Sequence, residues 1–353
     1  MTTVDHPVDR AVLPAPRGPL SAAVLDALRG DPPAAGLPSS VSGDPYGEDV
    51  QLALHLCYEL HYQGFAGVSD DWEWDPELLR FRAALERLFL DALRADVPGG
   101  ADIGGVLDEL LVEPVDGRGV SHFLKDEGQW WHMREYLVLR SIYHLKEADP
   151  HAWVIPRLRG AAKAALVAVE FDEFGGGRGD RMHSRLFADL LAGAGLDNGY
   201  LRYLEHAPAV MLATVNLMSL CGLHRSLRGS LVGHFAAAEI TTAPSATRMA
   251  KALERLDAHP ACVEFFTEHI EADAVHEQVM RRDVIGDLLS REPELTESVV
   301  FGVQATELLE QRLGDHLLGA WEKGQTALRL PLAENPNAEN PNAGNPNAGN
   351  PNG

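Results

Sequence analysis

Stretches of helical composition, separated by Gly and Pro, make up most of this chain and limit its fold more than any other feature. Apolar residues recur there at three- and four-residue spacing, and the strict alternation of a strand is almost absent. We therefore predict an all-α bundle. The helices are expected over about residues 48–61, 77–93, 104–112, 130–148, 150–174, 184–194, 199–206, 209–225, 229–240, 245–256, 262–290 and 293–325.

The two ends of the chain differ in composition from this body. Residues 1–45 are rich in Pro, Gly, Ala and Ser, with one amphipathic piece near Leu20–Leu28, so we expect a mostly disordered lead. Residues 46–129 are predicted to form an N-terminal helical extension, and residues 130–325 the main bundle. Residues 326–353 contain near-copies of an Asn-Pro-Asn-Ala/Gly unit and are predicted to be a disordered tail.

Charge and cysteine content exclude several kinds of protein. The formal net charge of −22 over 353 residues argues against nucleic acid as a partner, because no basic stripe is available to displace counterions. Cys57, Cys221 and Cys262 lie far apart and are expected to be buried free thiols. The first residues show no apolar signal region, and no run of 18 apolar residues occurs, so we expect a soluble, cytoplasmic protein without a membrane span.

A polar stripe on the helix near residue 270 is the first chemical signal. His269, Asp273 and His276 have the spacing i, i+4, i+7, which places them on one helix face within an arc of about 60°. Two imidazoles and a carboxylate on one face are typical of metal ligands. An ordinary solvated polar face is the competing interpretation, and matching groups on other helices favour the metal.

A second signal lies where the helix ending near residue 174 stops. Glu173 is followed by Gly175-Gly176-Gly177 and then by His183. On an unbroken helix Glu173 and His183 would lie about 80° apart, so the glycines predict a local unwinding that re-aims one of them. The competing interpretation is an ordinary turn between two helices, which would also contain glycines.

Two more carboxylates stand out by their surroundings. Glu239 ends an otherwise apolar helical stretch, where a carboxylate costs free energy unless it is paired or bound to metal. Glu147 lies near the end of its helix, and a salt bridge with Lys146 or an arginine is an equally good explanation. His55 and Glu59 are also spaced i, i+4, but we interpret them as a solvated helix face.

Taken together, the candidate ligands and the segment Asp172-Glu173-Phe174-Gly175-Gly176-Gly177-Arg178 resemble those of the heme-oxygenase-like diiron oxidases, often called iron-containing redox enzymes. The resemblance covers about residues 130–325. It implies a heme-oxygenase-like multi-helix bundle that holds two Fe(II) ions, with O2 as co-substrate. The implied metal ligands are Glu147, Glu173, His183, Glu239, His269, Asp273 and His276, with no catalytic residue beyond them.

The chemistry of this set agrees with iron. Four carboxylates and three neutral imidazoles offset the charge of two Fe(II) ions, and mixed oxygen and nitrogen donors suit iron. Glu239 is our choice for a bridging carboxylate. The two Glu-x-x-His motifs of ferritin-like proteins are missing, which argues against iron storage.

The sequence therefore predicts a non-heme diiron oxidase or oxygenase that acts on a small organic molecule by N-oxygenation or oxidative C–C cleavage. An external electron donor is expected, and a homodimer is left open. The alternatives are a metal-free helical scaffold and a cofactorless oxidase of the same fold. Several residues near the ligand helices could line a substrate pocket or belong to the core: Trp130, Trp131, Tyr143, His144, Trp153 and Arg178.

Overall fold

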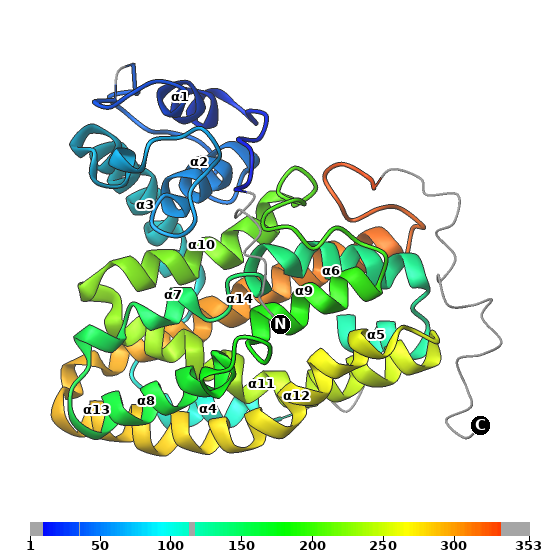
Figure 1. The fold of residues 1–353 in the computed structure, drawn as a ribbon. Coiled ribbons are helices and arrows are strands. Elements are labelled where there is room, and N and C mark those ends of the chain that lie inside the picture. Colours follow the sequence, from blue (N-terminus) through cyan, green and yellow to red (C-terminus); the bar gives the residue numbers. More distant parts are fainter. Residues whose placement is uncertain (1–9, 35, 113–116, 333–353) are drawn as a thin grey trace.

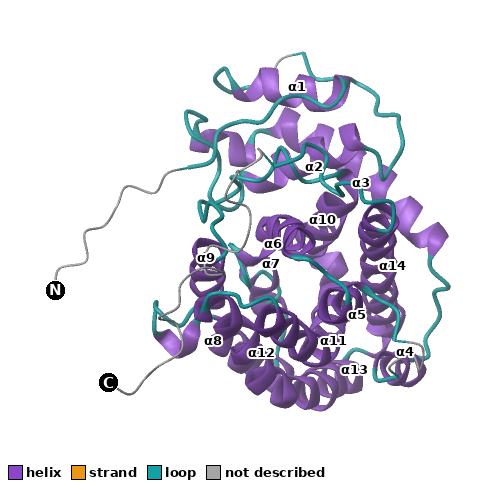
Figure 2. Cartoon of the chain, turned by 90° about the vertical axis from the view of Figure 1, so that its right-hand side faces the viewer, coloured by secondary structure: helices purple, strands orange, loops and turns teal. Residues whose placement is uncertain are grey.

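The fold is taken from a computed structural model, which describes residues 10–34, 36–112 and 117–332, without the side chains of residues 271–275. These residues contain helices and no strand, so the all-α prediction is confirmed (Figures 1 and 2). The α-helices are α1 Pro19–Leu28, α2 Glu48–Glu59, α3 Pro76–Asp96, α4 Ile103–Leu110, α5 Val120–Asp126, α6 Trp130–His144, α7 Asp149–Ala152, α8 Gly160–Glu173, α9 His183–Gly193, α10 Ala209–Leu223, α11 Arg228–Arg255, α12 Pro260–Gln278, α13 Gly286–Arg291 and α14 Thr296–Trp321.

Helices α1, α2 and α3 form a small layer on one side of the main bundle, over α10 (Figures 1 and 2). The segment expected to be a disordered lead contains α1, which packs on α2 and buries Leu20, Val24, Leu25 and Leu28. Helix α1 coincides with the amphipathic piece that the sequence showed near Leu20–Leu28. The repeat units from Glu334 onward lie outside the described residues.

Long helices form the centre of the main bundle, where α11 packs against both α12 and α14. The approach of α11 to α14 is unusually close. A Cβ atom on Gly233 would collide with the carbonyl oxygen of Val299, and one on Gly302 would collide with that of Ser230. These two glycines therefore set the distance between the two helices.

Several helix boundaries differ from the prediction, because the tertiary surroundings change the effect of Gly and Pro on a helix. Residues 199–206 form turns rather than a helix, with Leu201 at φ 54°. Residues 118–129, where no helix was predicted, contain α5, and the helix expected over 150–174 divides into α7, the 3-10 turn η2 (Ile155–Arg157) and α8. In contrast, α11 continues through Pro244, because packing on α12 and α14 outweighs one missing hydrogen bond.

Two polar residues of α2, His55 and Glu59, also differ from the prediction. His55 and Glu59 are buried rather than solvated, with 1% and 0% exposure. The three cysteines are free and buried, as predicted. Within the described ranges, no single helix has both the length and the apolar composition to cross a membrane; α10 and the residues 225–255 pass that test only as a pair bent by 107°.

Candidate metal centre

The glycine run after α8 brings two helix ends together. Glu173 is the last residue of α8, and His183 is the first residue of α9. Gly175, Gly176 and Gly177 have φ angles of 70°, 62° and 80°, which other residues rarely adopt. The run is thus a turn between two helices, and it places Oε2 of Glu173 2.8 Å from Nδ1 of His183.

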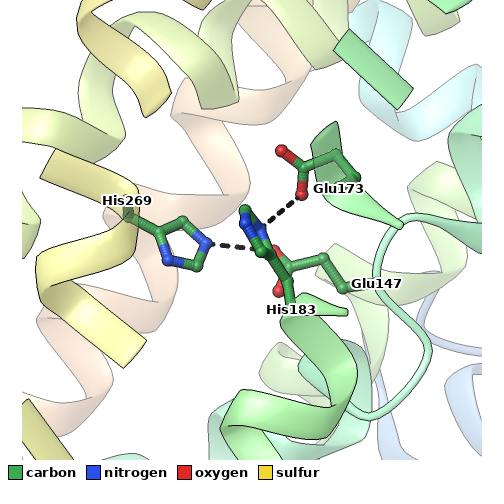
Figure 3. A group of neighbouring side chains, drawn as sticks. All are labelled: Glu147, Glu173, His183 and His269. Carbon is green, nitrogen blue, oxygen red and sulfur yellow. Dashed lines mark ion pairs between the residues drawn. The ribbon is translucent and has the colours of Figure 1, made fainter. Parts of the chain in front are cut away.

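Four buried side chains form a first group around this contact: Glu147, Glu173, His183 and His269. Their ligand atoms all lie within 4.8 Å of one another. Figure 3 shows the side chains turned toward a common point from α8, α9, α12 and the turn after α6. Although Glu173 and His183 are close, His183 Nδ1 does not have hydrogen-bond geometry. Atoms that face a common point in this way can coordinate one ion.

His269 is held in a form that suits coordination. Its Nδ1 contacts the carbonyl oxygen of Phe265 at 2.7 Å. A carbonyl can only accept, so Nδ1 carries the proton and Nε2 of the neutral ring keeps its lone pair. Nε2 lies 3.9 Å from Oε1 of Glu147, inside the first group. Metal-bound histidines are commonly oriented by such a hydrogen bond on the other ring nitrogen.

A second group consists of Glu173, Glu239 and His276, all buried. Nδ1 of His276 lies 2.9 Å from Oε2 of Glu239 and 3.8 Å from Oε1 of Glu173. Glu173 therefore belongs to both groups and turns one oxygen toward each. The sequence favoured Glu239 as the bridging carboxylate, whereas the carboxylate common to both groups is Glu173.

The seventh candidate, Asp273, belongs to α12 between His269 and His276, and its side chain lies outside the described part of the structure. The other six candidates are all brought together in the two groups.

The donor set fits a metal ion on electrostatic grounds. Among the described residues, no Lys or Arg forms an ion pair with Glu147, Glu173 or Glu239, whose ion-pair contacts there are all with histidines. Lys146, the other explanation for Glu147, instead binds Glu59 at 2.9 Å. Buried carboxylates need a compensating cation, and oxygen with imidazole ligands suits iron.

Burial and the neighbouring charges shift the pKa values of Glu239 and His276. Burial raises the pKa of Glu239, the Glu173 charge adds to the rise, and the His276 hydrogen bond opposes it. Burial acts in the opposite direction on His276, but its contacts with Glu239 raise the pKa of this imidazole to about 9. These contacts favour the protonated imidazole, and a metal ion bound at His276 would replace that proton.

Three polar groups lie around the centre beside the candidate ligands, and of these only Glu170 was not named in the sequence analysis. His144 donates a 2.9 Å hydrogen bond to Glu147, and Oδ2 of Asp172 lies 3.2 Å from Nε2 of His276. Glu170 is 2% exposed, and neither of its carboxyl oxygens has a hydrogen-bond partner among the described residues. Glu170 lies three residues before Glu173 on the same face of α8, a spacing that could have identified it.

A cavity of about 420 Å³ adjoins the centre, and its wall includes Glu147, Glu173, Glu239 and His269. Apolar side chains, among them those of Phe235 and Phe265, line another part of it. Of the six residues that the sequence offered as pocket or core, Tyr143 and His144 line this cavity.

Two further histidines in the cavity wall are held neutral. Burial lowers the pKa of His234 to about 4 and that of His151 well below its usual range. The Thr306 hydroxyl donates to the carbonyl of Gly302 at 2.7 Å, so Nδ1 of His234, 2.7 Å from that hydroxyl oxygen, must be the donor. Nε2 of His234 is then an acceptor, and it has no hydrogen-bond partner in the described structure.

Comparison with known proteins adds independent information. A sequence model of the family described as iron-containing redox enzyme matches residues 134–311, a range that contains all seven candidate ligands. Nitrosourea synthase of Streptomyces achromogenes subsp. streptozoticus is 26% identical over 200 residues, which are 56% of this chain and 42% of that protein. The chain thus matches less than half of the length of this relative.

Proposed function

Because this chain belongs to the iron-containing redox enzyme family and is an oxidoreductase, we propose that it is a non-heme diiron enzyme that uses O2 to oxidise a small organic molecule. The observation that carries the proposal is the pair of buried ligand groups that share Glu173. Two groups with one common carboxylate suit two ions held side by side. The proposed ligands are Glu147, Glu173, His183, Glu239, His269, Asp273 and His276.

The protein's own residues prepare the centre before any metal binds. Phe265 fixes the ring of His269 through its carbonyl, and His144 holds one oxygen of Glu147. Asp172 contacts the ring nitrogen of His276 that faces away from Glu239. Such contacts orient ligands and increase their basicity. Bound iron would supply the electrons that reduce O2, and an external donor would have to return them.

The adjoining cavity is the proposed substrate site. Its volume of about 420 Å³ lies in the range of small-molecule pockets. Besides the candidate ligands, its charged residues are Arg140, Arg248, Glu307 and Glu310, two of each sign. A wall that is balanced in this way favours an uncharged or zwitterionic molecule. His234 offers such a molecule a hydrogen-bond acceptor, which favours a substrate with an N–H or O–H group.

Two reaction types remain compatible with this site. The name of the relative, nitrosourea synthase, supports oxidation at nitrogen. Oxidative C–C cleavage needs the same centre and the same kind of cavity.

The first experiment is an anaerobic Fe(II) titration of the metal-free chain, with iron per chain as the readout. We expect saturation near two equivalents. Mixing with O2 should then oxidise the bound Fe(II), which is followed by optical absorbance and oxygen consumption. Absence of iron binding would contradict the proposal and favour the cofactorless oxidase or the scaffold.

A further inference from the structure

A second pocket, far from the metal centre, is lined mainly by arginines. Its volume is about 560 Å³, and its wall contains Arg157, Arg159, Arg225, Arg228 and Arg291 together with Glu292. So many guanidinium groups at one place are unexpected in a chain with a formal net charge of −22.

The pocket lies at the opposite end of α8 from the ligand Glu173. Arg159 immediately precedes Gly160, the first residue of α8, while Glu173 is its last. At 1.5 Å per residue the helix separates these ends by about 20 Å. Figure 1 shows α8 beside α13 at this end of the bundle, and the two helices are in contact. The pocket is therefore distinct from the cavity at the metal centre.

Carboxylates compensate only part of this positive charge. Arg228 pairs with Glu292, and Arg291 pairs with Asp287 at 2.9 Å. In the part of the chain that the structure describes, neither Arg157 nor Arg159 nor Arg225 forms an ion pair with a carboxylate. Five arginines less two carboxylates leave a local charge of +3.

The inner arginines are held in place by other parts of the fold. Arg157 donates from both terminal nitrogens to the carbonyl oxygens of Gly222 and Leu223 at the end of α10. Arg228 is only 16% exposed and is fixed by Glu292. Burial lowers the pKa of Arg157, and the nearby Arg225 charge adds to this shift. The like charges repel each other at close range, and an anion between them would relieve that repulsion.

We propose that this pocket binds a small oxyanion with several negative charges, carried by phosphate or carboxylate groups. Guanidinium groups match both through paired N–H donors. The pocket volume is within the range of small-molecule sites and leaves room for more than one anionic group. Arg157 and Arg228 form its fixed inner wall, and Arg159, Arg225 and Arg291 form its exposed rim.

The test is isothermal titration calorimetry on the full chain with bound iron. The probes are fructose 1,6-bisphosphate and tricarballylate, with fructose as the uncharged control. Neither anion has the groups of a strong iron chelator, so the iron content, measured after each titration, should not change. We expect one of the two anions to bind at one site per chain, and the Kd to rise with ionic strength. The probe that binds more tightly identifies phosphate or carboxylate as the preferred group.

Variants of the rim locate the binding. Arg159 and Arg225 are exposed, so R159Q/R225Q should fold normally and weaken binding at least tenfold. The matched control is R87Q/R94Q, which removes the same charge from exposed positions of α3 and should change Kd less than twofold. Equal weakening in the two variants would show a nonspecific charge effect and overturn the proposal. So would the absence of binding of both anions at millimolar concentration. Iron binding should be unchanged in both variants, so the result does not depend on the proposed diiron function.

Discussion

Nζ of Lys146 lies 2.9 Å from Oε2 of Glu59, and both side chains are almost completely buried. This ion pair connects the last residue of α2 to the residue that precedes Glu147, a candidate ligand. Tyr200 donates a 2.7 Å hydrogen bond to the other oxygen of Glu59. The N-terminal layer is therefore tied to the segment that carries Glu147, one of the candidate ligands.

Replacing Glu59 by Gln should strongly destabilise the protein. The amide leaves Lys146 as a buried charge without its partner, which costs about 3–5 kcal/mol in the free energy of unfolding. Urea unfolding followed by circular dichroism measures the loss. The control is E77Q, which breaks the exposed pair of Glu77 with Arg80 and should cost less than about 1 kcal/mol. Equal losses of unfolding free energy in E59Q and E77Q would show that the buried Lys146 charge is not stabilised by Glu59.

The shared position of Glu173 predicts different metal contents for two carboxylate variants. E239A removes a ligand from the second group alone, so it should retain close to one iron per chain. E173A damages both groups and should bind little iron. Metal analysis after anaerobic loading with Fe(II) distinguishes the two variants. The control is E254Q, at an exposed position of α11, which should keep two irons per chain. One retained iron in E173A would contradict a bridging role.

Glu170 should make stability depend on pH. Burial, followed by the charges of Glu173 and Glu239, raises its pKa from 4.5 to about 9. Between pH 4.5 and 9 the folded chain keeps this proton, whereas the unfolded chain releases it. The contribution of Glu170 to the free energy of unfolding is therefore fully present below pH 4.5. It decreases as the pH rises toward 9, by up to about 1.4 kcal/mol per pH unit. E170Q should therefore be more stable than the wild type at pH 8 and similar to it near pH 4.5. Urea unfolding of the metal-free proteins at both values measures the difference; a gap that does not grow with pH would contradict the assignment.

The contact between α11 and α14 predicts a strong effect of a single methyl group. G302A places a Cβ against the carbonyl of Ser230, and the two helices must separate. We expect the free energy of unfolding to fall by several kcal/mol, at least as much as when a core is overpacked. Iron binding should also weaken, because α11 carries Glu239. G319A, on the same helix α14, meets no atom of the described residues within 4 Å of the added Cβ. Because Ala favours helix, that control should be neutral or stabilised by up to about 1 kcal/mol. Similar unfolding curves for the two variants would show that the close approach is not required.

The sequence alone determined the helical class and the position of each candidate ligand on its own segment, because both are local. Helical periodicity is repeated within each segment, and the spacing of His269 and His276 places them on one face whatever surrounds the helix. The glycines after Glu173 likewise predicted a break in the helix, by local unwinding or a turn, through their own conformational freedom. Local rules failed where context outweighs propensity, as at Pro244, which lies inside a continuous helix.

Only the tertiary structure decided which distant groups meet. It made Glu173 the shared carboxylate instead of Glu239, and it paired Lys146 with Glu59 rather than with Glu147. It also gathered arginines from three separate segments, around residues 157, 225 and 291, into one pocket. The physical reason is that burial and electrostatic interactions act through space between helices, whereas helical propensity and spacing act along the chain.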